Sequence, residues 1–315
     1  MYEDKIRKIA WDLLEKGNVD FIIGWEKGSL PFLTAPLICR DVAETERLVW
    51  NPFCANNLAR YLKYYKGGKE KIALCVKGCD ARAVSVLLRE EQIERERLVL
   101  IGLPCHGLIN PKKLLENFPD ITPGEVEWEE GILRIRGKEE NIVHLLEGSC
   151  TRCRYPDPPI HDFLVGEKLG EGYAESSEVE DMLEYYDKMS TEEREEFFAR
   201  EMERCIRCYA CRNACPLCYC QECFAESTRP SWVSPAPLAF DNLLFQLGRT
   251  MHMAGRCVEC GACGRSCPVE IPIDILPEKV AESIRKEFGF ESGLDTGETA
   301  PLLTYREDDQ EDFIK

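Results

Sequence analysis

Histidines and long apolar runs are scarce in this chain of 315 residues, and basic residues are outnumbered by acidic ones. The sequence has 40 Lys and Arg against 57 Asp and Glu, which gives a formal net charge of −17, and only 4 His. Such a charge repels phosphate backbones and anionic lipid, so nucleic acid and membrane surfaces are poor candidate partners. No run of 18 or more apolar residues occurs, and we therefore expect no membrane insertion.

The N-terminus also lacks the features of an export signal. It reads as a charged amphipathic helix over Tyr2–Lys16 rather than as an apolar leader. The P-loop, the complete G-x-G-x-x-G fingerprint, the G-x-S-x-G elbow and the H-E-x-x-H motif do not occur either. We expect a cytoplasmic protein whose chemistry depends on a bound cofactor or on a partner.

Cysteine, by contrast, is abundant, with 18 residues. In a chain without an export signal, this abundance favours metal binding over disulfides. Most of these cysteines stand in tight groups, and thiolates held so close together need a cation to offset their mutual repulsion.

The hydrophobic pattern predicts an α/β N-terminal domain followed by a mostly helical domain. Short apolar strands and an intervening helix form a strand, helix, strand unit, expected at Lys71–Val76, Asp80–Arg95 and Arg97–Gly102. A hairpin follows at 125–136, and another helix is expected over Leu238–Ala254. We divide the chain into an α/β domain (1–170), an acidic connector (171–203) that we interpret as a solvated, partly helical segment, a helical cysteine-rich domain (204–287) and an acidic tail (288–315).

The helical domain contains the one internal repeat. Two runs have the spacing C-x2-C-x2-C-x3-C-P, and they comprise Cys205, Cys208, Cys211 and Cys215, then Cys257, Cys260, Cys263 and Cys267. This spacing holds [4Fe–4S] clusters in bacterial ferredoxins, where the fourth Cys of each run ligates the cluster of the other run. The crossed pattern predicts one cluster on Cys205, Cys208, Cys211 and Cys267, and a second on Cys257, Cys260, Cys263 and Cys215.

Zinc is the alternative metal for paired C-x2-C units. A tetrahedral zinc site needs only four ligands in all, whereas each of the two runs supplies four at the cluster spacing and ends in Pro. With its long link between the two runs, the segment at about 204–285 resembles the helical dicluster domain of heterodisulfide reductase C-type and fumarate reductase iron–sulfur subunits.

The first half carries a second set of motifs. They are Val76–Ala83, which contains Cys79; Gly102–Gly107, which contains Cys105; Cys150–Tyr155; and Asp162–Gly166. In order and character these motifs resemble the β-subunit family of coenzyme F(420)-reducing hydrogenases and formate dehydrogenases, although His161 stands where the closing motif has Ala. The resemblance implies a third [4Fe–4S] cluster on Cys79, Cys105, Cys150 and Cys153. The alternative for Cys79 and Cys105 is burial as core residues.

The same family holds FAD in front of that cluster, near a Lys-Ser-Gly type of turn. The nearest equivalent here is the turn at Lys27, Gly28 and Ser29, which departs from the pattern. A flavin at this turn and an ordinary loop are both open interpretations.

Six cysteines remain outside these sets. Cys39 and Cys75 lie in apolar contexts and are expected in the core. The other four, Cys54, Cys218, Cys220 and Cys223, are the candidate ligands of an additional, fourth cluster.

Clusters with complete cysteine ligation move single electrons and do not bind substrate. The sequence therefore predicts an electron-transfer subunit of an anaerobic oxidoreductase complex rather than a catalytic one, with no catalytic residue of its own. The partner would be a heterodisulfide reductase-like, hydrogenase, formate dehydrogenase or NAD(P)H flavoprotein module. Two alternatives stay open: a flavin-bearing subunit that itself reduces or oxidises F(420) or NAD(P), and a zinc scaffold or cluster-based redox sensor.

Overall fold

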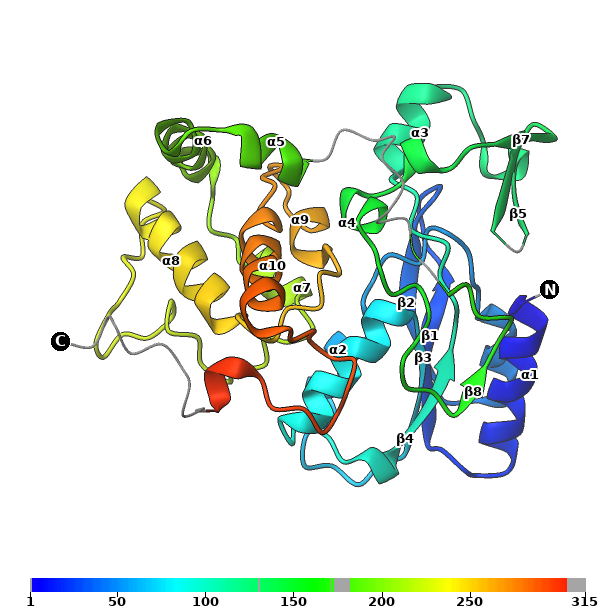
Figure 1. Ribbon diagram of the computed structural model, residues 1–315. Coiled ribbons are helices and arrows are strands. Elements are labelled where there is room, and N and C mark those ends of the chain that lie inside the picture. Colours follow the sequence, from blue (N-terminus) through cyan, green and yellow to red (C-terminus); the bar gives the residue numbers. More distant parts are fainter. Residues whose placement is uncertain (1, 130, 171, 173–181, 305–315) are drawn as a thin grey trace.

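The computed structural model describes residues 2–129, 131–170, 172 and 182–304. Its first half is a layered α/β unit, and its second half is a group of helices packed against one end of that unit (Figure 1). The predicted fold class, α/β followed by mostly helical, is confirmed.

A five-stranded sheet in the order β2-β1-β3-β4-β8 organises the first half. Its strands are β1 (Phe21–Lys27), β2 (Thr34–Cys39), β3 (Ile72–Val76), β4 (Leu98–Gly102) and β8 (Phe163–Leu164). β1, β3, β4 and β8 run parallel, and β2 pairs antiparallel with β1. The expected strand, helix, strand unit is confirmed as β3, α2 (Gly78–Arg89) and β4, while β2 was not predicted because its residues do not alternate cleanly between buried and exposed.

Helices cover the sheet, and a small second sheet stands at its edge. α1 (Tyr2–Glu15) packs against the sheet through Ile6, Ala10 and Leu13, and α2 supplies the other covering helix. The predicted hairpin is confirmed as β5 (Val126–Glu129) and β6 (Ile132–Ile135), extended by β7 (Lys138–Glu140). Short helices complete this half, namely 3-10 helices at Val42–Arg47, Leu58–Tyr65, Arg95–Arg97, Pro123–Glu125 and Val143–Leu145, with α3 (Pro111–Asn117) and α4 (Gly148–Thr151).

The second half consists of short helices around the cysteine runs. They are α5 (Met182–Lys188), α6 (Thr191–Arg204), α7 (Ala210–Ala214), α8 (Ala239–His252), α9 (Ala262–Arg265) and α10 (Ile275–Phe288). The helix predicted over Leu238–Ala254 is therefore confirmed as α8. The acidic connector forms α5 and all of α6 except its last residue, Arg204, and residues 171 and 173–181 lie outside the described part.

The two halves share a hydrophobic core. Leu217, Met253 and Val258 of the helical half belong to the same buried cluster as the sheet residues. Buried Arg82 of α2 donates to the carbonyls of Ser292 and Val258, so the start of the predicted acidic tail lies against the first half. The tail continues through a 3-10 helix at Pro301–Leu303, and residues 305–315 lie outside the described part.

Candidate iron–sulfur and flavin sites

One cavity lies at the carboxyl ends of β3 and β4, the edge where open parallel sheets bind their ligands. Cys79 is the second residue of α2, which follows β3, and Cys105 follows β4. Cys150 and Cys153 come from α4 and the residues after it. All four cysteines line this cavity. The Cys150 sulfur accepts a hydrogen bond from the Leu108 amide at 3.3 Å.

A buried cation lies beside these four thiols. The Lys77 ammonium is 2.9 Å from the Asp80 carboxylate, and both side chains are almost completely buried. Lys77 Nζ also donates to the Cys54 and Asn56 carbonyls and lies 4.1 Å from the centre of the Trp25 ring. Burial lowers the pKa of Lys77, but Asp80 and the neighbouring Cys79 raise it overall, so the residue is a fixed positive charge.

The helical half contains two further cavities lined by cysteines. Cys205, Cys208, Cys211 and Cys267 line one, with Phe245 and Gln246 of α8 at its wall. Cys215, Cys257, Cys260 and Cys263 line the other. The chain thus brings together the same two sets of four that the crossed ferredoxin pattern predicts.

Arg249 of α8 lies between these two cavities and is only 3% exposed. It lines the second cavity, and its Nη2 donates to the Cys211 carbonyl of the first at 3.3 Å. Within the described residues, its Nε and Nη1 have no hydrogen-bond partner. Burial lowers the pKa of Arg249, but Cys263 and Cys215 raise it well above its usual range. A buried guanidinium facing thiols suits an anionic cluster, since buried charges need compensation.

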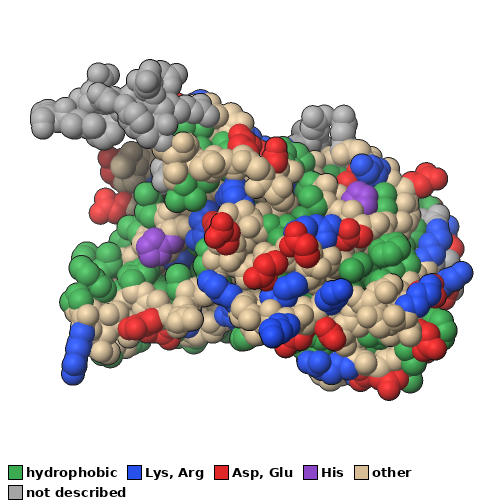
Figure 2. Space-filling model, turned by 90° about the horizontal axis from the view of Figure 1, so that it is seen from below, with side chains coloured by type: hydrophobic (Ala, Val, Ile, Leu, Met, Phe, Trp, Pro, Cys, Tyr) green, Lys and Arg blue, Asp and Glu red, His purple; other side chains and the backbone are tan. Residues whose placement is uncertain are grey.

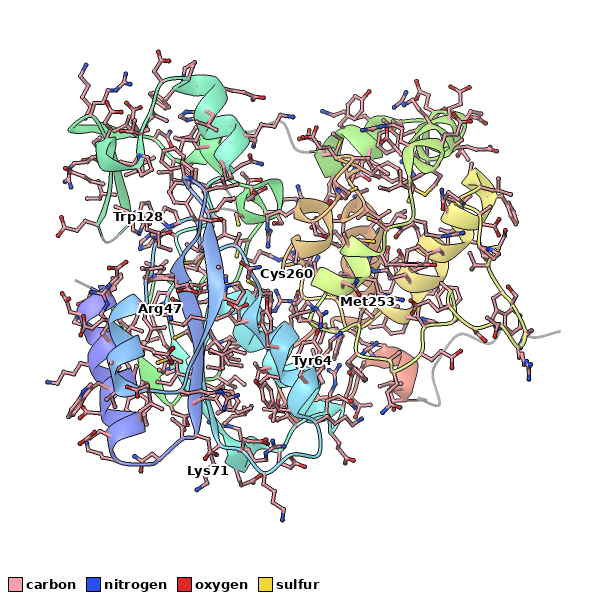
Figure 3. All side chains as sticks on the ribbon, turned by 180° about the vertical axis from the view of Figure 1, so that it is seen from behind. Arg47, Tyr64, Lys71, Trp128, Met253 and Cys260 are labelled. Atoms are coloured by element: carbon pink, nitrogen blue, oxygen red, sulfur yellow. The ribbon has the colours of Figure 1, made fainter. Side chains whose placement is uncertain are left out.

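The cavity in the first half adjoins the second cavity of the helical half. Glu259 and Cys260 line both of them. Figure 3 shows Cys260 at the boundary between the two halves, and Met253 lies on the helical side of it. A side chain at Gly261 would collide with Ser149 of the first half, so glycine permits this close approach. The cavity at the sheet edge thus adjoins the cavity of Cys257, and Arg249 connects the latter to the cavity of Cys205.

The cysteines outside these sets lie in different environments. Cys39 and Cys75 are buried in the core, as predicted. Cys54 is also fully buried, and its sulfur lies near the Val49 carbonyl and the Asn51 side chain. Cys220 is exposed, whereas Cys218 and Cys223 are partly buried. These contacts of Cys54 do not include the other three thiols, and a fourth cluster stays a prediction.

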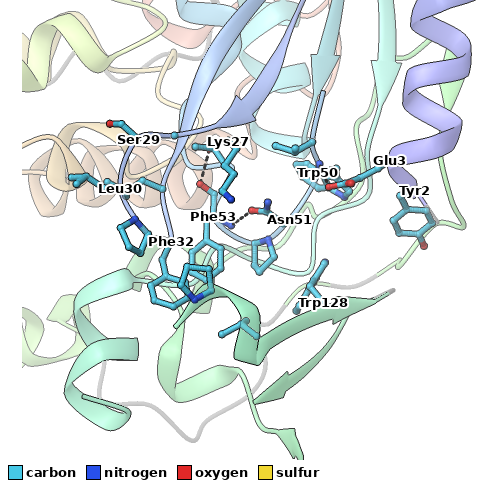
Figure 4. A pocket seen from close by; sticks show the side chains of 18 of the residues that line it. Tyr2, Glu3, Lys27, Ser29, Leu30, Phe32, Trp50, Asn51, Phe53 and Trp128 are labelled. Atoms are coloured by element: carbon cyan, nitrogen blue, oxygen red, sulfur yellow. Dashed lines mark hydrogen bonds between the residues drawn. The ribbon is translucent and has the colours of Figure 1, made fainter. Parts of the chain in front are cut away.

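A larger cavity of about 560 Å³ lies beside the turn between β1 and β2. Lys27, Gly28 and Ser29 line it, together with aromatic side chains at Phe32, Trp50, Phe53 and Trp128. Figure 4 shows Phe32 and Phe53 close together at one end and Trp50 and Trp128 toward the other. The Gly28 amide donates to the Leu33 carbonyl, and a Cβ at Gly28 would collide with that oxygen, so the tight turn requires glycine.

This cavity lies next to the cysteine-lined cavity of the first half. Pro52 lines the large cavity and accepts a hydrogen bond from the Ile109 amide, while the preceding Leu108 lines the cysteine cavity. The volume and the mixture of aromatic and polar side chains are typical of a small-molecule or cofactor site. The aromatic side chains come from segments that are distant in the sequence, so only the turn at Lys27, Gly28 and Ser29 indicated this cavity in the sequence.

Among the described residues, no three His, Cys, Asp or Glu side chains stand in the arrangement that binds a single metal ion. Nor does any helix in the described part have the length and apolar character needed to cross a membrane.

Comparison with known proteins identifies relatives of both halves. Residues 201–271 match the family described as "4Fe-4S dicluster domain". The F(420)-dependent formate dehydrogenase subunit beta of Methanocaldococcus jannaschii is 26% identical, over 90% of this chain and 89% of the relative. The chain is similar to formate dehydrogenase β-subunits over nearly its whole length. This confirms the resemblance found from the sequence motifs.

Two further proteins match this chain. The F(420)-dependent formate dehydrogenase 1 subunit beta of Methanococcus maripaludis is 28% identical, over 92% of this chain and 90% of the relative. A chain of the xenon-derivatised F(420)-reducing [NiFe] hydrogenase complex from Methanosarcina barkeri matches at 17% identity and a TM-score of 0.38. That match spans 47% of this chain and 58% of the hydrogenase chain.

Proposed function

We propose that the chain is an iron–sulfur electron-transfer subunit of an oxidoreductase complex, with three [4Fe–4S] clusters in series. The observation that carries this proposal is the set of three neighbouring cavities, each lined by one predicted set of four cysteines, with Cys260 of the middle set also lining the cavity at the sheet edge. The cluster on Cys257, Cys260, Cys263 and Cys215 would stand in the middle. Clusters supply one-electron transfer when bound, and the chain supplies thiolate ligands, buried cations and exclusion of water.

The electron path would run from the sheet edge to the far side of the helical half. Cys79, Cys105, Cys150 and Cys153 would hold the first cluster, beside Lys77. Cys205, Cys208, Cys211 and Cys267 would hold the last one, whose ligand Cys208 is exposed. An exposed ligand brings that cluster to the surface, where a partner can exchange electrons with it.

The number of clusters can be tested by iron analysis. We expect about twelve irons per chain in anaerobically purified protein, because each cluster contains four. Cys79→Ala should lower this to about eight. The matched control is Cys75→Ala, a buried cysteine of the adjacent strand that lines none of the three cavities, and it should keep all twelve. Equal iron content in the two variants would eliminate the cluster at the sheet edge.

The crossed ligation can be tested separately. Cys267→Ser should alter the paramagnetic resonance of the cluster held by Cys205, Cys208 and Cys211, because Cys267 lines the cavity of those three. If only the cluster held by Cys257, Cys260 and Cys263 changed, the ligands would follow the sequence order instead.

The large cavity supports a second candidate function, a subunit that binds FAD and exchanges a hydride with F(420) or NAD(P). The supporting observation is its aromatic lining at the predicted turn of Lys27, Gly28 and Ser29, next to the cysteine cavity. A flavin there would convert two-electron into one-electron transfer. About one FAD released per iron-replete chain supports this function. Iron without flavin would leave a relay whose substrate lies in the partner.

The partners that we propose are other subunits of such a complex. Formate dehydrogenase and hydrogenase modules are named in the relatives that match this chain. A heterodisulfide reductase-like or NAD(P)H flavoprotein module would accept the same single electrons.

A further inference from the structure

α8 presents an apolar stripe to solvent. Phe240, Leu244, Leu247 and Met251 are 75%, 39%, 46% and 63% exposed. Their spacing of four, three and four residues places them on one side of the helix, because an α-helix has 3.6 residues per turn. We call these four residues the α8 face. The helix is dark yellow in Figure 1 and lies on the side of the helical half away from the sheet.

The opposite side of α8 is buried in the chain. It contains Asn242, Phe245, Gln246, Arg249 and Thr250, and it packs against α6 and α10. Four of these five buried residues are polar, whereas the exposed stripe is apolar, which is the reverse of an ordinary surface helix. Figure 2 shows hydrophobic side chains also gathered at this end of the molecule, although 31% of all residues in the chain are charged. Contiguous exposed apolar surface of this kind marks interaction sites.

The α8 face lies directly over the proposed last cluster. Phe245 and Gln246 line the cavity of Cys205, Cys208, Cys211 and Cys267, and Gln246 Nε2 lies 3.6 Å from the Cys211 sulfur. Leu244 and Leu247 neighbour them on the same turns. A molecule seated on the α8 face would therefore be separated from this cluster by about one helix diameter, roughly 10 Å.

Charge at the border of this face indicates the kind of occupant. The Asn242 side chain donates to the Met202 carbonyl, which joins α8 to the end of α6. α6 exposes five glutamates against two arginines, namely Glu192, Glu193, Glu195, Glu196 and Glu203 against Arg200 and Arg204. A partner with an apolar patch bordered by basic side chains would complement this border. A second copy of this chain would bring its own acidic α6 toward the first and would be repelled.

We propose that the α8 face is the docking site for the redox subunit that exchanges electrons with the last cluster. This inference rests on the proposed relay function. The partner contributes an apolar surface that covers Phe240, Leu244, Leu247 and Met251, with basic side chains opposite α6. Docking there shortens the electron path and removes the apolar stripe from water.

The test uses the full, iron-replete chain and the native complex isolated through a tag on this chain, with its other subunits identified. Hydroxyl-radical footprinting of free chain and complex should show at least a fivefold loss of labelling at Phe240 and Met251 in the complex. Trp11 of α1, 45% exposed, is the internal reference and should change less than twofold. Undiminished labelling at Phe240 and Met251 would overturn the proposal.

The double variant Leu244→Glu with Leu247→Glu adds a functional readout. Electron transfer from the reduced chain to the identified partner should fall at least tenfold, whereas iron content and reduction of methyl viologen stay unchanged. The control, Leu115→Glu on α3, introduces one glutamate at an exposed leucine outside the α8 face and should retain normal transfer. Absence of cluster iron in the wild-type chain would instead refute the proposed relay itself. Normal electron transfer in the double variant would refute the docking site. So would a dimer of the wild-type chain that the double variant dissociates while the complex with the partner still forms.

Discussion

At the scale of single residues, buried charges are the feature that distinguishes this chain from an ordinary α/β protein. Lys77 and Arg249 are both nearly inaccessible, and each borders a cavity lined by cysteines. Placing a cation in a protein interior is costly unless negative charge is nearby. Asp80 supplies that negative charge for Lys77, and clusters held by the thiolates would supply it for Arg249.

Removing the Lys77 ammonium should destabilise the fold, because Asp80 would remain buried without its partner. Breaking a buried ion pair typically costs about 3–5 kcal/mol. We expect Lys77→Met to lower the free energy of unfolding by that amount, measured anaerobically in denaturant. Lys16→Ala, at an exposed ion pair with Asp12, should cost below about 1 kcal/mol. Equal losses of unfolding free energy in the two variants would contradict a stabilising role for the buried pair of Lys77 and Asp80.

Arg249 should influence the reduction potentials of the two proposed clusters in the helical half. Reduction adds negative charge to a cluster, which a nearby guanidinium stabilises. Arg249→Met should therefore lower the potentials of both clusters in the helical half, by roughly 60 mV for each ~1.4 kcal/mol of lost interaction. Arg249→Lys should shift them less. Thr250→Val is a control in the next buried position of α8, and a shift as large as that of Arg249→Met would indicate a packing effect.

Glu278 of α10 should make stability depend on pH. Burial raises its pKa from 4.5 to about 8, although Arg152 donates to its carboxylate at 3.0 Å. Between these two values the folded state binds more protons than the unfolded state, so this group's contribution to stability falls as pH rises, by at most about 1.4 kcal/mol per pH unit. Glu278→Gln should become progressively more stable than wild type from pH 5 to pH 8. Parallel stability profiles would show that the carboxyl group does not titrate in this range.

At the scale of secondary-structure elements, glycine controls the contact between the two halves. Gly261 and Gly289 both have φ +63°, a conformation that favours glycine, but only at Gly261 would a Cβ collide with another residue, Ser149. Gly289→Ala should therefore cost about 1–2 kcal/mol through backbone strain alone. Gly261→Ala should cost more and should lower iron content as well. Equal losses of stability would mean that the contact with Ser149 is not restrictive.

Much of the architecture follows from sequence patterns at this scale. The parallel strands β3 and β4 are continuous apolar runs, and α8 and the hairpin have clear periodicities. The positions of Cys79 and Cys105 in the sequence predicted that they follow the ends of two strands, and the structure places them after β3 and β4. β2 was missed because its exposed edge includes Pro36 and Ile38, which obscure the alternation.

Contacts between distant segments could not be predicted in this way. Arg249 occupies an ordinary helical position in the sequence, and only packing shows that it lies between two cysteine cavities. The large cavity likewise combines the turn at Gly28 with Trp50 and Phe53 of one loop and with Trp128 of β5. Cys54 illustrates the same limit, because its complete burial in the core depends on the tertiary fold.

At the scale of the whole molecule, the two halves form one structure around the cysteine cavities. Figure 3 places Cys260 where they meet, and Arg82 and Arg265 cross the same boundary to bind Ser292 and Ala55 carbonyls. Such an arrangement keeps the proposed middle cluster at a fixed position relative to its neighbours. Separate domains on a flexible linker would not do so.

The most direct test of this account is the paramagnetic resonance spectrum of the fully reduced chain. If the cluster on Cys257, Cys260, Cys263 and Cys215 stands between the other two, it should couple magnetically to both. Cys79→Ala should then remove one of these couplings and leave the interaction within the helical half. Three independent signals, or remaining signals that are unchanged when the first cluster is lost, would contradict a continuous relay.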